Sequence, residues 1–169
     1  PSAVTFEEAA ATLNGALTAL VYLRNLAKPA RGERVLVYGA SGAVGTAALQ
    51  LAKHFGAEVT GVCSTRNLEL VRSLGADRVI DYTTERFTDD GVIYDVVFDT
   101  VGATTFAQVR PVLTRRGRYL VTDFGVREVF QMIWTSLGRG PRVIGGASNF
   151  HWQAADLELL AAMLAAGQL

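Results

Sequence analysis

Short apolar runs alternate with stretches of helical periodicity along most of the chain. The runs predict six strands, at residues 34–38, 58–63, 78–80, 94–98, 118–122 and 142–146. Apolar residues at helical spacing predict helices at residues 6–26, 43–55, 67–74, 106–113, 126–137 and 154–166. In the first helix Gly15 is expected to break or bend the helical path.

This alternation indicates an α/β fold, because a crossover between parallel strands requires a connection as long as a helix. Six strands in two halves suit a doubly wound parallel six-stranded sheet, the Rossmann fold, with helices on both faces and strand order 3-2-1-4-5-6. At 169 residues, the chain is expected to form one domain over residues 1–169.

Composition narrows the classes of protein that fit. Sixteen basic residues balance sixteen acidic ones and no Lys/Arg run stands out, so no nucleic-acid or anionic-membrane surface is expected. The single cysteine, Cys63, cannot form an internal disulfide, which makes a reducing cytoplasmic location the default. No stretch approaches the roughly 18 apolar residues of a membrane span.

A glycine-rich turn follows the first predicted strand directly. It contains Gly39, Gly42 and Gly45, with spacing G-x-x-G-x-x-G in place of G-x-G-x-x-G, and a helix begins after it. Such a turn lets the backbone approach a pyrophosphate and aims the positive end of the helix dipole at it. Gly42 is the expected point of close approach, Gly45 is expected to pack helix on strand, and the predicted cofactor contacts are Ser41, Gly42, Ala43 and Val44.

Two other phosphate-binding classes fit poorly. A Walker A loop needs Lys followed by Ser or Thr after its last glycine, whereas Thr46 and Ala47 follow Gly45. A short-chain dehydrogenase needs Tyr and Lys four residues apart, and neither Lys28 nor Lys53 has such a tyrosine.

The second strand ends in Ser64, Thr65 and Arg66, with no acid between Val59 and Leu68. An NAD site normally places Asp or Glu here for the ribose 2′-OH, whereas two hydroxyls and a guanidinium suit a 2′-phosphate. This favours NADP(H); alternatively, Ser64 caps the next helix and Arg66 is solvated.

The fourth and fifth strands end at the predicted ligand crevice. Asp99, Thr100 and Val101 follow the fourth strand, and contact with ligand is expected through Thr100 and Val101, while Asp99 can equally be a structural cap. Phe124 and Gly125 hold the equivalent place after the fifth strand.

No metal site and no catalytic acid, base or nucleophile is predicted. Neither His54 nor His151 has a Cys, His or carboxylate at ligand spacing.

With these residues in view, the chain resembles the cofactor domain of the medium-chain dehydrogenase/reductase superfamily, in particular its zinc-independent quinone oxidoreductase branch. The most specific segments are residues 6–10 (FEEAA), 15–19 (GALTA), 34–45 (RVLVYGASGAVG) and 74–82 (LGADRVIDY). The resemblance implies that Thr18 lies near the nicotinamide carboxamide and that Tyr82 joins Ser64 and Arg66 at the 2′-phosphate, although both can simply pack. Zinc-dependent members carry a cysteine ligand near residues 13–15, and none is present.

The resemblance also implies an activity: hydride transfer from NADPH to a quinone or an α,β-unsaturated carbonyl. The barrel-like domain that completes the substrate pocket in this family is not in the chain, so we expect a domain fragment that binds cofactor but is inactive alone. The alternatives are an enoyl reductase, free-standing or from a polyketide or fatty-acid synthase, and a non-catalytic NADPH-binding protein. Relatives pair through an edge strand, which predicts a homodimer through the segment between Arg142 and Ala147.

Overall fold

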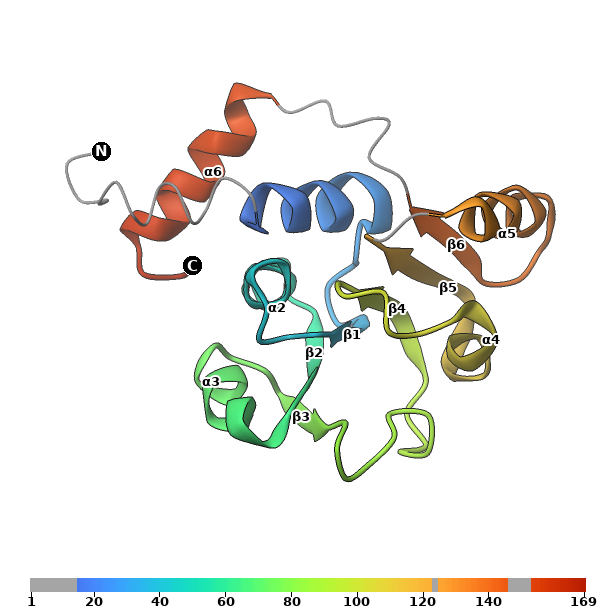
Figure 1. The fold of residues 1–169 in the computed structure, drawn as a ribbon. Coiled ribbons are helices and arrows are strands. Elements are labelled where there is room, and N and C mark those ends of the chain that lie inside the picture. Colours follow the sequence, from blue (N-terminus) through green and yellow to red (C-terminus); the bar gives the residue numbers. More distant parts are fainter. Residues whose placement is uncertain (1–14, 123–124, 146–152) are drawn as a thin grey trace.

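The computed structural model describes residues 15–122, 125–145 and 153–169, and it contains one six-stranded sheet (Figure 1). Its strands are β1 (Arg34–Tyr38), β2 (Glu58–Cys63), β3 (Arg78–Asp81), β4 (Tyr94–Asp99), β5 (Leu113–Val121) and β6 (Arg142–Gly145). All pairings are parallel and the order is β3-β2-β1-β4-β5-β6, which confirms the predicted doubly wound fold.

Helices cover both faces of the sheet. One face packs against residues 15–27, α2 (Ala43–His54), α3 (Leu68–Ser73) and α6 (Ala154–Ala165). The other packs against α4 (Phe106–Val109), η3 (Arg110–Val112) and α5 (Val126–Leu137). The central strand β1 explains why both faces are needed, because Val35, Leu36 and Val37 are fully buried and point alternately into the two cores.

The helix expected at residues 6–26 is described from Gly15 onward, and its residues 6–14 lie outside the described residues. Residues 15–20 are α-helical, and the helix then widens into a π-helical segment, η1 (Val21–Ala27), which ends at Lys28 in the left-handed conformation. A Cβ at Gly15 would lie 2.4 Å from the Ala43 carbonyl oxygen. Gly15 therefore permits close packing on the start of α2.

The fifth strand begins five residues earlier than predicted. Its first part contains Arg115 and Arg116, whose charges hide the strand pattern, and its pairing with β4 shifts in register between Tyr94 and Val96. The preceding helix is correspondingly shorter than predicted. The helix expected at residues 67–74 also starts differently, because Thr65–Asn67 form a 3-10 turn, η2, before α3.

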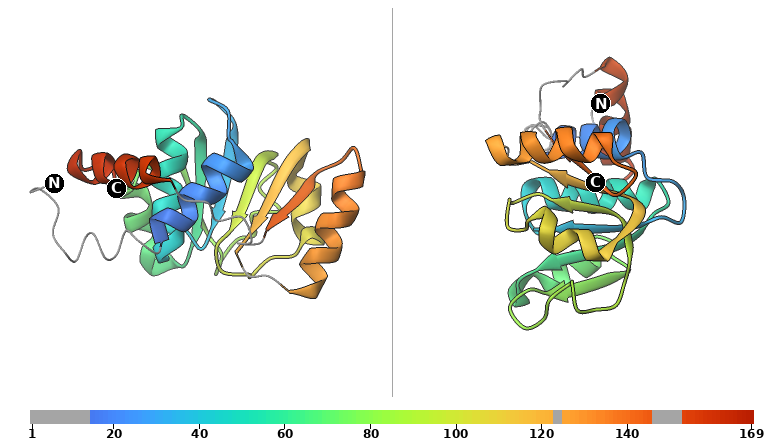
Figure 2. Two further views of the ribbon diagram at one scale, coloured as in Figure 1. Left: turned by 90° about the horizontal axis from the view of Figure 1, so that it is seen from above. Right: turned by 90° about the vertical axis from the view of Figure 1, so that its right-hand side faces the viewer.

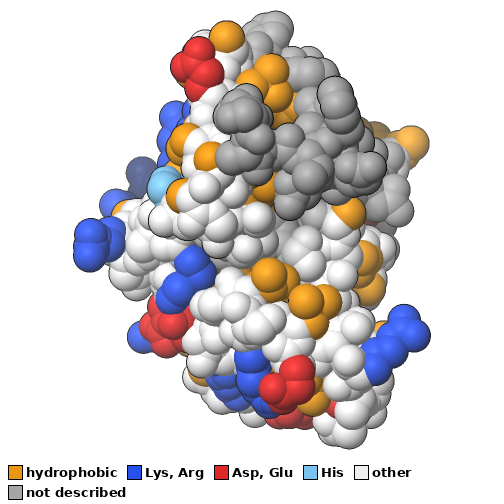
Figure 3. Space-filling model, turned by 90° about the vertical axis from the view of Figure 1, so that its left-hand side faces the viewer, with side chains coloured by type: hydrophobic (Ala, Val, Ile, Leu, Met, Phe, Trp, Pro, Cys, Tyr) orange, Lys and Arg blue, Asp and Glu red, His pale blue; other side chains and the backbone are white. Residues whose placement is uncertain are grey.

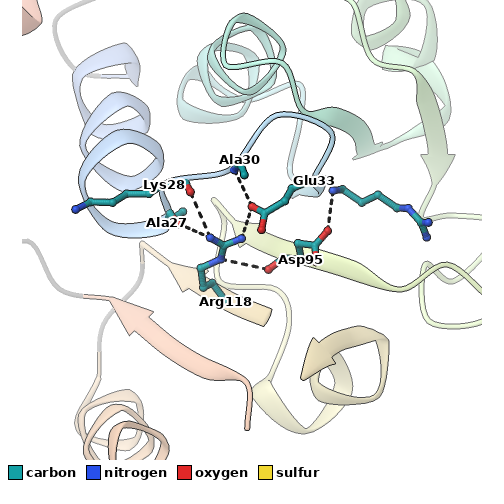
Figure 4. Close-up of polar contacts among 7 residues, drawn as sticks. Ala27, Lys28, Ala30, Glu33, Asp95 and Arg118 are labelled. Atoms are coloured by element: carbon teal, nitrogen blue, oxygen red, sulfur yellow. Dashed lines mark hydrogen bonds and ion pairs between the residues drawn. The ribbon is translucent and has the colours of Figure 1, made fainter. Parts of the chain in front are cut away.

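Two ionic contacts join segments that are far apart in the sequence. Arg118 of β5 donates to the carbonyls of Ala27 (2.6 Å) and Lys28 (3.4 Å) and pairs with Glu33 (Figure 4). These contacts attach the loop that precedes β1 to β5. On the other side of the molecule, fully buried Asp156 of α6 pairs with Arg24 of η1, and Figures 1 and 2 show α6 lying beside that helix.

Candidate functional site

Each glycine of the turn between β1 and α2 has a different structural role. Gly39 has φ +81°, and a Cβ there would collide with Thr100 Oγ1 (2.8 Å) and a Val101 methyl (2.7 Å). A Cβ at Gly45 would lie 2.0 Å from the Gly39 carbonyl oxygen, so Gly45 packs α2 against the turn as predicted. At Gly42 the nearest protein atom is Gly39 O at 3.4 Å. Gly42 is exposed, which leaves its outer side open to a ligand.

The open side of Gly42 coincides with the amino terminus of α2. Gly42 is the N-cap residue, no side chain caps the helix, and the exposed Ala43 and half-buried Val44 form its first turn. The first N–H groups of a helix have no partner within it and carry the positive end of its dipole. A twelve-residue helix with an open N-terminus and no acid in its first turn suits an anion such as a pyrophosphate.

Thr18 belongs to the helix that packs on this turn. It is half-buried, and it lies three residues beyond Gly15, which contacts Ala43.

The segment after β2 is linked to the glycine turn by a residue that the sequence analysis did not single out. Asn67 Nδ2 donates to Ser41 Oγ (2.9 Å) and to Ser64 Oγ (3.3 Å). Ser64 is the N-cap residue of η2, but its side chain makes no capping hydrogen bond. Arg66 is exposed beside it. Asn67 was not predicted because an asparagine just after a strand usually indicates only a turn.

Thr65 is directed toward β3. Its hydroxyl donates to Asp81 Oδ2 (2.5 Å) and lies 3.0 Å from Thr83 Oγ1. These hydrogen bonds from Thr65, and then those from the Thr83 hydroxyl and N–H, hold the pKa of Asp81 below its usual range. The Thr65 hydroxyl thus satisfies a carboxylate, and among Ser64, Thr65 and Arg66 it is the least available to a ligand.

Tyr82 begins an aromatic group at the ends of β1 and β3. Its exposed ring stacks on Tyr38 with centroids 6.3 Å apart, and Tyr38 meets Phe87 edge-on at 5.8 Å. Burial, and then the charge of Asp99, raises the pKa of Tyr38, so its hydroxyl stays protonated at neutral pH. A cavity of about 400 Å³ opens beside these rings, lined also by Arg86 and Ala103. Its lining combines aromatic rings with polar side chains, and its volume leaves room for a planar ring system.

The turn after β4 is built around Asp99, which is fully buried. Its carboxylate accepts from Val101 N (3.0 Å), Thr104 N (2.7 Å) and Thr104 Oγ1 (2.7 Å), so Asp99 orders the turn, whereas the residue that caps the following helix is Thr105. Thr100 Oγ1 donates to the Tyr38 carbonyl at 2.8 Å. Val101 is 54% exposed above Gly39. The turn therefore presents an apolar side chain next to the glycine turn.

Gly125 lies at the start of α5, exposed, with its N–H donating to Glu128 Oε2 at 3.0 Å. A hollow of about 200 Å³ adjoins it, lined also by Thr104 and Tyr119. Phe124 lies outside the described residues.

The described candidates share one edge of the sheet. Ser64, Tyr82 and Thr100 directly follow the last residues of β2, β3 and β4, and the glycine turn follows β1. Cys63 ends β2 among them, but burial, and then the charge of Asp81, raises the pKa of its thiol, which makes it a poor nucleophile. Among the described residues, no group of three His, Cys, Asp or Glu side chains is placed to hold a metal ion.

Comparison with known proteins places this arrangement among oxidoreductases. The family model described as "Zinc-binding dehydrogenase" matches residues 43–155. An Arabidopsis thaliana protein named NADPH-dependent alkenal/one oxidoreductase, chloroplastic, is 53% identical over 73 residues, covering 42% of this chain and 19% of its own length.

Solved structures agree along the whole chain. The quinone oxidoreductase from Coxiella burnetii has a TM-score of 0.86 at 28% identity, covering 100% of this chain and 52% of its own. The CurK enoyl reductase has a TM-score of 0.82 at 28% identity, covering 100% of this chain and 54% of its own. The chain spans less than half the length of the curated relatives that it matches.

Proposed function

The chain belongs to the zinc-binding dehydrogenase family, and from that premise we propose that it binds NADP(H) for hydride transfer to a quinone or an α,β-unsaturated carbonyl. One observation carries the proposal: the open glycine turn at α2 adjoins the end of β2, where the segment that follows offers Ser64 and Arg66 and contains no acid of its own. Bound there, the cofactor supplies the hydride.

The glycine turn holds the pyrophosphate in this proposal. Gly42 gives it room, and the N–H groups of Ala43 and Val44 donate to it at the positive end of α2. Ser41 stays fixed beside it through Asn67.

The 2′-phosphate is held by Ser64, Arg66 and Tyr82. The Arg66 guanidinium supplies charge and paired donors, and the two hydroxyls supply further donors. Thr65 contributes indirectly, because its hydroxyl donates to Asp81 and so occupies one oxygen of that carboxylate. The aromatic cavity beside Tyr38 and Tyr82 takes the adenine ring.

The nicotinamide half extends along Thr100, Val101 and Gly125 toward Thr18, with Phe124 completing the predicted set. Val101 excludes water from one side of the ring, and Gly125 leaves room for the ring to approach. No side chain of the described site is assigned a proton transfer.

The electron acceptor is proposed from relatives whose names specify one. Quinone and alkenal/one oxidoreductases favour a quinone or an enone. An enoyl reductase is the second candidate, favoured by the match to CurK. A non-catalytic NADPH-binding protein would bind cofactor at the same residues without reducing any of these acceptors.

Titration calorimetry with NADPH and NADH tests the site, using the chain, Arg66→Ala and Gly42→Ala. We expect NADPH to bind at least about tenfold more tightly than NADH, and Arg66→Ala to remove that preference while leaving NADH binding unchanged. Gly42→Ala should weaken both cofactors, with circular dichroism unchanged because its Cβ meets no protein atom closer than 3.4 Å.

Arg72→Ala is the matched control, because Arg72 is an exposed arginine on α3 that pairs with Glu69. It should bind both cofactors as the parent does. Equal affinity of the parent for NADPH and NADH would overturn the 2′-phosphate assignment, and binding of neither would overturn the cofactor site.

Two finer proposals concern assembly and location. We propose a homodimer through the segment between Arg142 and Ala147, supported by the place of β6 at the edge of the sheet; Gly146 and Ala147 lie outside the described residues. A monomer by light scattering at high concentration would contradict it. A cytoplasmic location is supported by the lone buried thiol of Cys63, and cell fractionation tests it.

A further inference from the structure

A buried tyrosine links the helix that precedes β1 to the carboxyl-terminal edge of the sheet. Charged side chains on the face shown in Figure 3 are basic and acidic in mixture, as on a solvated surface. Inside the fold, Tyr22 of η1 is only 2% exposed, and its hydroxyl donates to the Val121 carbonyl at 2.9 Å. A phenylalanine ring would bury the same apolar surface, so what the tyrosine adds is this hydrogen bond.

Tyr22 belongs to the π-helical segment, η1. Lys28 N donates to the Leu23 carbonyl, five residues back, which is the spacing of a π-helical turn. Such turns are rare and occur frequently at functional sites. The same helix carries Thr18 four residues before Tyr22, and the proposed function places Thr18 near the nicotinamide. The unusual part of this helix therefore directly follows a residue of the proposed site.

The ring of Tyr22 contacts a second strand that ends at the proposed site. It stacks on Phe98 of β4, with centroids 5.2 Å apart and planes 21° from parallel. Phe98 is fully buried, and it precedes Asp99, which orders the turn that carries Thr100 and Val101. One side chain thus supports the ends of both β4 and β5.

The ends of β4 and β5 are also joined to each other. Thr122 N donates to the Asp99 carbonyl at 3.3 Å, and Thr122 directly follows Val121, whose carbonyl accepts from Tyr22. Tyr22, β4 and β5 therefore form a closed set of contacts. Gly125 lies three residues after Thr122 in the sequence. A displacement at Val121 is thus transmitted both to the turn after β4 and to the segment that leads to Gly125.

We propose that Tyr22 is a positioning residue for the nicotinamide ring. Its hydroxyl fixes the end of β5 and its ring fixes the end of β4, so the two segments keep the separation that an oriented nicotinamide needs. This inference rests on the proposed function, in which the nicotinamide lies along Thr100, Val101 and Gly125. Tyr22 is buried and acts through the backbone of Val121, so it is not a catalytic residue.

The two halves of the cofactor should respond differently to Tyr22. Its contacts reach the ends of β4 and β5, whereas Ser64 and Arg66, proposed for the 2′-phosphate, follow β2. Adenosine 2′,5′-bisphosphate contains the adenine and the 2′-phosphate but no nicotinamide. It therefore serves as a probe that occupies the proposed site without the ring that Tyr22 positions.

The test compares NADPH with adenosine 2′,5′-bisphosphate by titration calorimetry. Tyr22→Phe should bind NADPH about fivefold more weakly than the parent, the effect expected for one hydrogen bond, and the bisphosphate within about twofold of the parent. At saturating NADPH, the anisotropy of nicotinamide fluorescence should fall in Tyr22→Phe, because the ring is held less firmly. A merely structural role would change neither the ratio of the two affinities nor this anisotropy.

Tyr94→Phe is the matched control. Tyr94 is also fully buried, and its hydroxyl donates to Asp90 Oδ2 at 2.7 Å, but it begins β4 at the opposite edge of the sheet. This variant should lower the melting temperature about as much as Tyr22→Phe while leaving both affinities unchanged. Phe98→Leu removes the stacked ring and keeps the Tyr22 hydroxyl, and it should weaken NADPH severalfold while sparing the bisphosphate. Far-ultraviolet circular dichroism checks that each variant is folded.

Two results would overturn the proposal in a parent that binds NADPH. One is that Tyr22→Phe leaves both the NADPH affinity and the nicotinamide anisotropy unchanged. The other is an equal loss of affinity for both ligands, which would mean that the hydroxyl only stabilises the fold. If Tyr22→Phe does not fold, Phe98→Leu decides by the same ratio. A parent that binds neither ligand would instead overturn the proposed function, and this inference with it.

Discussion

Helices α2 and α5 have the same length, twelve residues, and each connects a strand to the next one in sequence, yet they use their apolar residues in opposite ways. In α2 Ala48, Leu49 and Leu51 are fully buried against the sheet. In α5 the large apolar side chains face outward, and Met132 and Thr135 hold the helix in place. The spacing of apolar residues thus predicts where a helix forms. Which of its faces packs on the sheet depends on tertiary contacts that the spacing does not contain.

Truncating one apolar residue on each helix gives the largest contrast. Leu49→Ala should lower the free energy of unfolding by about 3 kcal/mol, because it leaves a cavity in a closed core. Phe130→Ala, on a side chain 69% exposed, should change it by less than about 0.5 kcal/mol. Urea unfolding measures both values. A large loss of unfolding free energy for Phe130→Ala would show that the exposed apolar face of α5 is covered in solution.

Alanine at the first turn of each helix should give a smaller contrast. Gly45→Ala pushes a Cβ to within 2.0 Å of the Gly39 carbonyl oxygen, so we expect a loss of about 2 kcal/mol as the turn shifts. At Gly125 the nearest atom is the flexible Glu128 carboxylate at 2.9 Å, and Gly125→Ala should cost less than about 1 kcal/mol. Thermal unfolding compares the two, and equal losses would contradict the packing described for Gly45.

The smallest expected effect on stability is that of the Lys53–Asp77 pair at the carboxyl end of α2. Lys53 donates to Asp77 at 2.7 Å; desolvation raises the pKa of Asp77, but hydrogen bonds from Lys53 and Val59 N, together with the lysine charge, lower it overall. The lowered pKa means that the unfolded chain binds protons first, so this stabilisation is complete above about pH 4 and is lost as the pH falls through the native pKa.

Asp77→Asn should therefore flatten the acid side of the stability curve between about pH 5 and pH 2, and only slightly, because the carboxylate is 40% exposed. Lys53→Gln should shift the curve in the same direction. Urea unfolding across that pH range measures the dependence of stability on pH. An unchanged slope in both variants would show that the Lys53–Asp77 pair does not contribute to the loss of stability in acid.

The fold was largely predictable because its strands are continuous apolar runs and its turns contain glycine. The parts that were missed depend on tertiary contacts. Residues 113–117 look polar in sequence, yet they extend β5. Asn67 gains its role only when β2 ends beside the glycine turn.

A basic cluster on the surface is the clearest case of this limit. No run of basic residues occurs in the sequence, so its charge pattern predicts no basic cluster. The fold nevertheless gathers Arg115, Arg116, Arg139 and Arg142 from two strands and a loop. Charge patterns along a chain therefore detect only those clusters that are contiguous in sequence.

The two hydrogen bonds of Asn67 bear on how affinity arises. The side-chain amide of Asn67 donates to both Ser41 and Ser64, so it links the two loops that form the proposed cofactor site. Part of the conformational entropy that binding would otherwise lose is then already lost when the chain folds. In the proposed site, the loops that would contact the pyrophosphate and the 2′-phosphate are thus already linked, so binding would cost mainly the freedom of the cofactor itself.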